Sequence, residues 1–193
     1  MKKFYSFVLL LVLVYPSINA QFTKVGGGLA FGSGFYFNNE PYSDYRSGHL
    51  AVSFKGIYEI TLPIHISPSF TVFYPNITKT ENFRSSIFSM MFDVNGHYVF
   101  NSLDRFEFYG LAGLNILLAW ERSKSAASNT TFKQNDNAFG LNLGAGTYIK
   151  ISDQFDAYVE AKYIISRYDQ FMLNAGVLVN LDWLIKHEKK ILN

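Results

Sequence analysis

Charged residues of both signs recur inside segments that are otherwise rich in apolar and aromatic residues. If these segments are strands, side-chain parity places four cations and four anions on one face: Lys24, Lys55, Lys150 and Lys162 with Glu59, Asp93, Glu107 and Glu160. An unpaired charge in a poorly hydrated interior is costly, so equal numbers indicate paired side chains. We expect this lumen charge network to be structural, while an ion path or a catalytic carboxylate stays an alternative.

Histidines are the other candidates for chemistry. His49 lies near Ser47 and Asp44, residue types that a lipid-modifying hydrolase could use. A triad is defined by geometry and not by closeness in sequence, so this is a weak indication of catalysis. His65, His97 and His187 lack metal-ligand spacing. The sequence therefore predicts no catalytic residue, no cofactor and no metal site, and we expect the protein not to be an enzyme.

The elements that would position these residues are β-strands, because apolar and polar residues alternate with period two along most of the chain. Between residues 88 and 100, Phe88, Met90, Phe92 and Val94 share one face, and Asp93 lies on the other. A slip of one residue would exchange the two faces, so the register is well specified. Eight strands are predicted: 24–37, 49–59, 66–74, 88–100, 106–120, 137–150, 155–167 and 171–181.

Connectors between these strands alternate in length. Those at 38–47, 75–84 and 121–136 are long, and those at 60–65, 101–105 and 151–154 are shorter. The last, at 168–170, is short and breaks the trend. Long loops at one end and tight turns at the other are typical of outer-membrane barrels, whose long loops are extracellular. An even number of strands leaves both termini at the periplasmic end.

The N-terminal segment predicts export. Lys2 and Lys3 precede an apolar run from Phe4 to Val14, and a small residue, Ala20, precedes Gln21. This is the pattern of a cleaved signal peptide at residues 1–20, and the run is too short to span a bilayer as a helix. Residues 21–193 then form one barrel domain that ends in a short polar tail.

Charge and cysteine content exclude several classes of protein. Without the two lysines of the signal, fifteen basic residues match fifteen acidic ones, so nothing favours a nucleic-acid partner. The absence of cysteine excludes disulfides, thiolate metal sites and a lipidated cysteine. No later segment has eighteen consecutive apolar residues, which excludes a helical membrane protein.

Two observations place the apolar face outside, against lipid, and not inside as in a soluble barrel. The other face is rich in glycine, including Gly28 and Gly144, which suits a narrow interior with bulky neighbours. Aromatic residues such as Phe100 and Trp120 gather at strand ends, as in interfacial girdles. The fold class is therefore all-β: an eight-stranded antiparallel up-and-down transmembrane β-barrel.

The chain resembles the small outer-membrane β-barrel domain proteins of Gram-negative bacteria. The signal, the eight amphipathic segments, residues 109–114 (YGLAGL) and residues 174–177 (NAGV) carry the resemblance. It implies an outer-membrane location, contact with outer-membrane lipid and insertion by the barrel-assembly machinery. Many such barrels end on an aromatic residue, whereas here Trp183 is followed by a polar tail, so we expect an internal insertion signal.

Three functions stay open on the sequence. The first is a non-enzymatic, structural or interaction role, with a protein partner at the extracellular loops and a lumen filled by side chains. The second is a small pore or transporter for polar solutes. The third is a lipid-modifying enzyme. Eight strands enclose an interior that side chains just fill, which favours the first.

Overall fold

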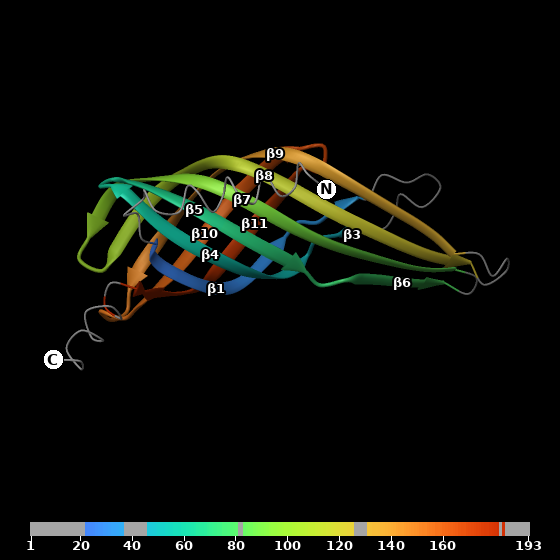
Figure 1. The fold of residues 1–193 in the computed structure, drawn as a ribbon, viewed down its shortest axis with the longest axis horizontal. Coiled ribbons are helices and arrows are strands. Elements are labelled where there is room, and N and C mark those ends of the chain that lie inside the picture. The colour runs from blue at the N-terminus through green and yellow to red at the C-terminus, as the bar shows by residue number, and fades with distance from the viewer. Residues whose placement is uncertain (1–21, 37–45, 81–82, 126–130, 182, 184–193) are drawn as a thin grey trace, which may run out of the picture.

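A computed structural model describes residues 22–36, 46–80, 83–125, 131–181 and 183. Eight long antiparallel strands form the closed ring of the main sheet (Figure 1). They are β1 (Phe22–Gly32), β4 (Leu50–Thr61), β5 (Ile64–Phe73), β7 (Phe83–Leu103), β8 (Phe106–Ser125), β9 (Thr131–Lys150), β10 (Phe155–Ser166) and β11 (Gln170–Asn180). Three short strands accompany them: β2 (Phe35–Tyr36), β3 (Arg46–Ser47) and β6 (Asn76–Thr80).

The main sheet closes into a barrel because each of the eight ring strands pairs with a neighbour on both of its sides. β1 pairs with β11 from Lys24 opposite Asn180 onward, and β5 pairs with β7 from Ile64 opposite Tyr98 onward. Closure leaves no unpaired edge within the ring of eight strands, which is a condition for crossing a membrane with strands. The predicted eight-stranded antiparallel barrel is confirmed.

The faces of the strands alternate as the sequence predicts. On β4, Val52 and Phe54 are exposed while Ser53 and Lys55 are buried, and this alternation recurs around the ring. An apolar exposed face and a partly polar buried face are the reverse of a soluble barrel. The outward surface is thus suited to lipid.

Tight turns gather at the end of the barrel that holds the start of β1 and the end of β11. Only Leu62 and Pro63 separate β4 from β5, and only Asp104 and Arg105 separate β7 from β8. Asp104 has a positive φ of 43°, a left-handed conformation that Asp tolerates in such hairpins. By the rule for outer-membrane barrels this is the periplasmic end.

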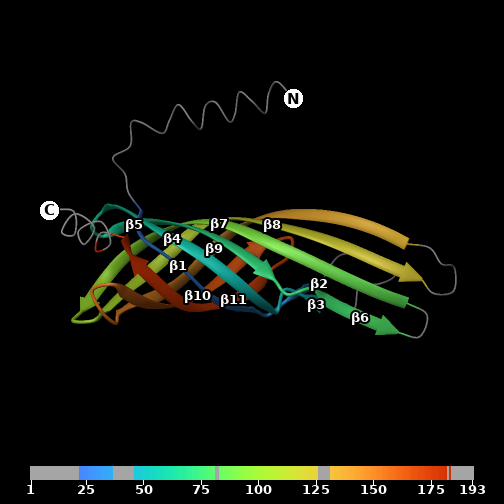
Figure 2. The same ribbon diagram turned by 60° about the horizontal axis from the view of Figure 1, so that its bottom comes forward.

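The other end differs from the prediction, because two segments expected as loops are mostly strand. β7, β8 and β9 have 21, 20 and 20 residues, against 10 to 12 in the other five strands of the ring. Pairing of β5 with β7 ends at Met90, and pairing of β10 with β9 ends at Gly140. Beyond these residues, β6 and residues 83–89, 119–125 and 131–139 form one four-stranded extension, which we call the projecting sheet (Figure 2).

One predicted strand differs from the structure, and other predicted segments fall on residues that the structure does not describe. The first predicted strand, 24–37, is divided: β1 stops at Gly32, and β2 pairs with β3 in a separate small sheet. The predicted signal at 1–20, part of the connector at 38–47 and the tail from residue 184 lie outside the described residues. Within the described residues, no α-helix is long and apolar enough to cross a membrane.

Candidate functional site

The centre of the lumen holds a carboxylate that accepts hydrogen bonds from several strands. Lys162 of β10 donates to Asp93 Oδ2 of β7 at 2.7 Å. Asn115 and Asn142 donate to Asp93 Oδ1 at 2.7 and 2.8 Å, and Ser69 donates to Oδ2 at 3.1 Å. β7 and β10 are not neighbours in the sheet, so this ion pair reaches across the lumen.

A second buried carboxylate, Glu160 of β10, makes a similar set of contacts. Lys55 of β4 forms an ion pair with Glu160 Oε2, and Tyr109 donates to the same oxygen at 3.0 Å. Asn174 donates to Oε1 at 3.4 Å, and His97 Nε2 lies 3.8 Å from Oε2. β4 and β10 are separated in the ring by β1 and β11, so this pair also spans the lumen.

Aromatic rings fill the space between the Glu160 cluster and the periplasmic mouth. His97 stacks on Tyr109 with ring centroids 4.3 Å apart and planes inclined by 11°. The Tyr148 hydroxyl lies 2.6 Å from His97 Nδ1. Below them, Lys24 Nζ lies 5.5 Å from the centre of the Tyr148 ring and 2.6 Å from Asp156 Oδ2. Each of these side chains projects from the strand position that parity assigns to the interior.

Glycines give these rings their room. A Cβ on Gly146 would lie 2.5 Å from the Tyr109 ring, and one on Gly176 would lie 2.8 Å from the Tyr158 ring. Neither position can therefore hold a larger residue without displacing a buried tyrosine. This accords with the glycine-rich inward face seen in the sequence.

The outer half of the interior contains a hydrophobic core, which the sequence pattern did not predict. A cluster of buried residues from all eight ring strands and from two of the connections between them occupies it: Ala30, Phe35, Ala51, Phe73, Ile87, Met91, Leu117, Ala119, Ala138, Ile164, Tyr168 and Met172. Met91 and Met172 are 0% exposed. The inward face thus changes from ion pairs and tyrosines near the periplasm to a hydrophobic core near the outer end.

The structure divides the eight residues of the predicted lumen charge network into three groups. Lys55, Asp93, Glu160 and Lys162 are buried and form the two cross-lumen ion pairs. Lys24 and Glu107 are half-buried toward the periplasmic mouth. Glu59 and Lys150 are exposed, and Lys150 pairs with Asp153 at 2.9 Å. These last two depart from the prediction because they stand at strand ends, where parity no longer implies enclosure.

The periplasmic mouth is the solvated part of the site. A pocket of about 140 Å³ there is lined by Asp104, Arg105, Glu107, Tyr148, Lys150, Asp156 and Asn180. In the adjoining turn, the hydrogen bond and positive charge of Lys150 lower the pKa of the Asp153 carboxyl. The sequence pattern did not single out Asp156, the partner of Lys24. Its inward direction was nevertheless readable, because it lies two residues before Tyr158, an inward residue of β10.

The uncharged members of the network were also missed as site residues. Asn115, Asn142 and His97 are buried; the two asparagines donate to Asp93, and His97 lies between the Tyr148 hydroxyl and Glu160. Their inward parity was readable, but their partners lie on strands far away in sequence. Only the closed barrel defines those contacts.

His49, the sequence candidate for hydrolytic chemistry, gains no catalytic partner in the described part of the chain. His49 is half-buried, and its ring centroid lies 6.4 Å from that of Phe31. Asp44 and the side chain of Ser47 lie outside the described residues. Among the described residues, no group of three His, Cys, Asp or Glu side chains could hold a metal ion.

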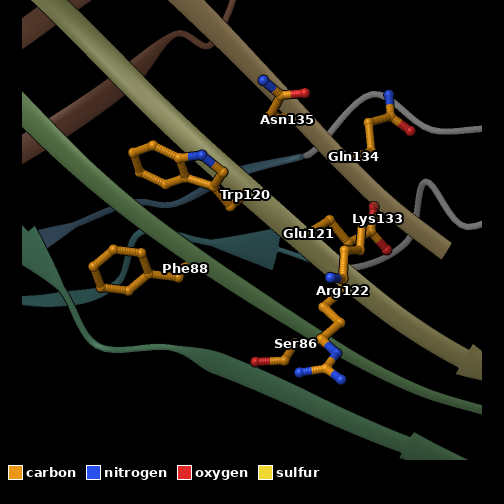
Figure 3. A pocket seen from close by; sticks show the side chains of 8 residues that line it. All are labelled: Ser86, Phe88, Trp120, Glu121, Arg122, Lys133, Gln134 and Asn135. Atoms are coloured by element: carbon orange, nitrogen blue, oxygen red, sulfur yellow. The ribbon is translucent and has the colours of Figure 1, made fainter. Parts of the chain in front are cut away.

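A second pocket lies on the outer surface at the base of the projecting sheet. It has a volume of about 330 Å³ and is lined by Ser86, Phe88, Trp120, Glu121, Arg122, Lys133, Gln134 and Asn135 (Figure 3). The Phe88 and Trp120 rings stack with centroids 5.9 Å apart and planes inclined by 28°. Arg122 and Lys133 stand next along the same face. Phe88 and Trp120 lie at the ends of predicted strands, but the sequence did not predict this site because Glu121, Arg122, Lys133, Gln134 and Asn135 fall in a segment expected as a loop.

Closed strand pairing, an apolar outer surface and charged residues paired inside define an integral outer-membrane β-barrel protein. The family model described as outer membrane protein beta-barrel domain matches residues 5–183. The chain therefore belongs to this family, and its location is the bacterial outer membrane. No curated protein sequence is significantly similar to it.

Solved structures show the same fold at low sequence identity. The attachment invasion locus protein Ail of Yersinia pestis is 15% identical, with a TM-score of 0.51, and the match covers 80% of this chain and 95% of Ail. Neisserial surface protein A is 13% identical, with a TM-score of 0.52 and coverage of 84% and 99%. The N-terminal barrel domain of Pseudomonas aeruginosa OprF is 16% identical, with a TM-score of 0.50 and coverage of 84% and 99%.

Proposed function

We propose that this barrel has a non-enzymatic interaction role at the cell surface, carried by the projecting sheet, and that its lumen is closed. The observation that carries the proposal is the extra length of β7, β8 and β9. A strand of 9–11 residues is enough to cross the membrane. Residues 131–139 of β9 add roughly 30 Å of strand beyond the rim at ~3.3 Å per residue.

The edge of the projecting sheet suits a protein partner. Among the described residues, the part of β9 from 131 to 139 pairs only with β8, so its other edge presents backbone N–H and C=O groups. Exposed strand edges bind extended segments of other proteins by main-chain hydrogen bonds. Phe132, 59% exposed near the tip, adds an apolar contact.

The contents of the lumen support the closed interior. Two ion pairs cross it, tyrosines stack beneath them, and a hydrophobic core fills the outer half. An open path for polar solutes would require moving buried charges away from their partners, at a cost of several kcal/mol. A pore is therefore the weaker alternative, and the described residues bring no catalytic group together in support of an enzyme.

A photo-crosslinking experiment in intact cells tests the interaction role. A photoreactive amino acid in place of Phe132 should capture a discrete protein partner at the cell surface. The same amino acid in place of Leu103, exposed at the periplasmic end, is the matched control and should not capture that partner. Identical crosslinks at both positions, or none at Phe132, would contradict the proposal.

A further inference from the structure

The outward face of the projecting sheet carries a concentration of positive charge. Five exposed basic residues lie on it, and we call them the basic face: Lys79, Arg84, Arg122, Lys124 and Lys133. Strand register places them in two rows. Lys79, Arg84 and Lys124 lie opposite one another across β6, β7 and β8, and Arg122 lies opposite Lys133 across β8 and β9.

Such an arrangement calls for an anion. Like charges directly opposite each other on neighbouring strands are destabilising. None of the five forms an ion pair within the described part of the chain. The carboxylate next to Arg122 in sequence, that of Glu121, is on the other face of the sheet and accepts hydrogen bonds from Ser85 and Ser123 at 2.9 and 2.5 Å. Among the described residues no carboxylate thus compensates the basic face, which leaves it open to an anion from outside the molecule.

The depth of the basic face in the membrane indicates where the compensating negative charge lies. Along β8 the same outward face carries Leu114, then Trp120 beside Phe88, then Arg122 two residues further. Two residues of strand span about 7 Å. Aromatic girdles mark the boundary of the hydrocarbon region in outer-membrane barrels, so Arg122 and Lys133 stand at the depth of the lipid headgroups.

We infer that the basic face binds the phosphate groups of the glycolipid in the outer leaflet of the outer membrane. The guanidinium of Arg122 matches phosphate geometry with two parallel hydrogen bonds, and Lys133 adds a second charge. Between them and the stacked pair Phe88–Trp120, the pocket of Figure 3 has room for a headgroup sugar, with Asn135 at its side as a hydrogen-bond partner. This role is separate from the protein contact proposed for the edge of β9.

Lipid binding by the full mature protein tests the inference. The protein is reconstituted in phosphatidylcholine nanodiscs, and its affinity is measured for bis-phosphorylated lipid A and for the same lipid A with both phosphates removed. The wild type should prefer the phosphorylated form. Arg122→Gln with Lys133→Gln should weaken that binding about tenfold or more, because two charged hydrogen-bond donors are lost, and should leave binding of the dephosphorylated form unchanged.

Matched controls keep the outcome interpretable. Arg105→Gln with Lys150→Gln removes the same charge at the periplasmic end and should leave the phosphate preference intact. If the first pair prevents folding, Lys79→Gln with Lys124→Gln removes two cations further from the membrane and should reduce the preference by a smaller factor. Equal affinity for both lipids, equal behaviour of the variants and the wild type, or binding of soluble heparin in place of lipid A would overturn the inference.

Discussion

The contacts in the lumen allow the effect on stability of removing the Glu160 side chain to be predicted in detail. Glu160 is 1% exposed and accepts hydrogen bonds from Lys55, Tyr109 and Asn174. Glu160→Ala leaves the Lys55 ammonium without the carboxylate that it pairs with, while the Tyr158 ring stays 4.7 Å away. Breaking a fully buried ion pair by removing one partner costs about 3–5 kcal/mol. We expect a loss of unfolding free energy in that range.

The measurement is equilibrium unfolding in urea of the protein in lipid vesicles, followed by tryptophan fluorescence. A double-mutant cycle built from Lys55→Met and Glu160→Met separates the ion pair from simple loss of packing. Each single variant leaves one buried charge, whereas the double variant Lys55→Met with Glu160→Met leaves none at this pair. Replacing a buried pair by apolar residues is often neutral or stabilising, so the double variant should be more stable than either single one.

Glu59→Ala is the control for this experiment, because Glu59 is exposed and makes none of the ion pairs found among the described residues. It should change stability by less than about 0.5 kcal/mol. If Glu160→Ala were as mild as Glu59→Ala, or if the two effects in the cycle simply added, Glu160 would be solvated. A hydrated lumen, and with it a pore, would then replace the closed interior.

The other predictions concern the wall and the bore of the barrel. Boiled and unboiled samples should migrate differently on a detergent gel, since a closed barrel resists detergent until heated; identical mobility would count against closure. Leu143→Arg or Val177→Arg, both on the lipid-facing surface, should destabilise the barrel by about 2–4 kcal/mol in urea titrations. Asn142→Ser should also be costly, because Asn142 donates to both Asp93 and Asn95. Planar-bilayer recordings of the wild type should show no steady conductance, and a stable open channel would refute the closed lumen.

Period-two alternation predicted the barrel because lipid and lumen impose different chemistry on successive residues. Phe92 and Asp93 meet these two environments from adjacent positions, so the sequence defines both the strand and its register. The same parity places Tyr109, Tyr148 and Tyr158 on the inward face, and each of them is buried. Signals of this kind are local and can be read without knowing which strands pair.

Residues 121–125 of the projecting sheet were not predicted as a strand because neither face of this segment lies in the hydrocarbon region of the membrane. In residues 121–125 the inward Glu121 and Ser123 are as polar as the outward Arg122 and Lys124, so hydrophobicity does not alternate. The segment is nevertheless a strand, held by pairing with β7 on one side and β9 on the other. Hydrophobic periodicity reflects a difference between the environments of the two faces of a strand. It therefore does not reveal a strand whose two faces lie in similar environments.

Partners across the lumen were beyond prediction for a different reason. Lys55 and Glu160 are 105 residues apart, and Lys162 and Asp93 are 69 apart. Parity places each of them inside, but it does not say at which height or opposite which strand. Height depends on the shear of the closed sheet, which sums the register of every pair around the ring. Parity therefore identified the four fully buried charges as inward, but it did not predict how they pair.

Residue types along the outward face of β7 and β8 change with depth in the membrane. This face begins with Phe92 and Leu114 against hydrocarbon, passes through the stacked Trp120, and ends in Arg122 and Lys124. The opposite face changes independently, from the ion pairs of the lumen to its hydrophobic core. Since the outward sequence of environments follows a bilayer and the inward one does not, lipid has shaped the outward face up to and including its cations. A basic patch that served a soluble ligand alone would have no reason to begin where the aromatic girdle ends.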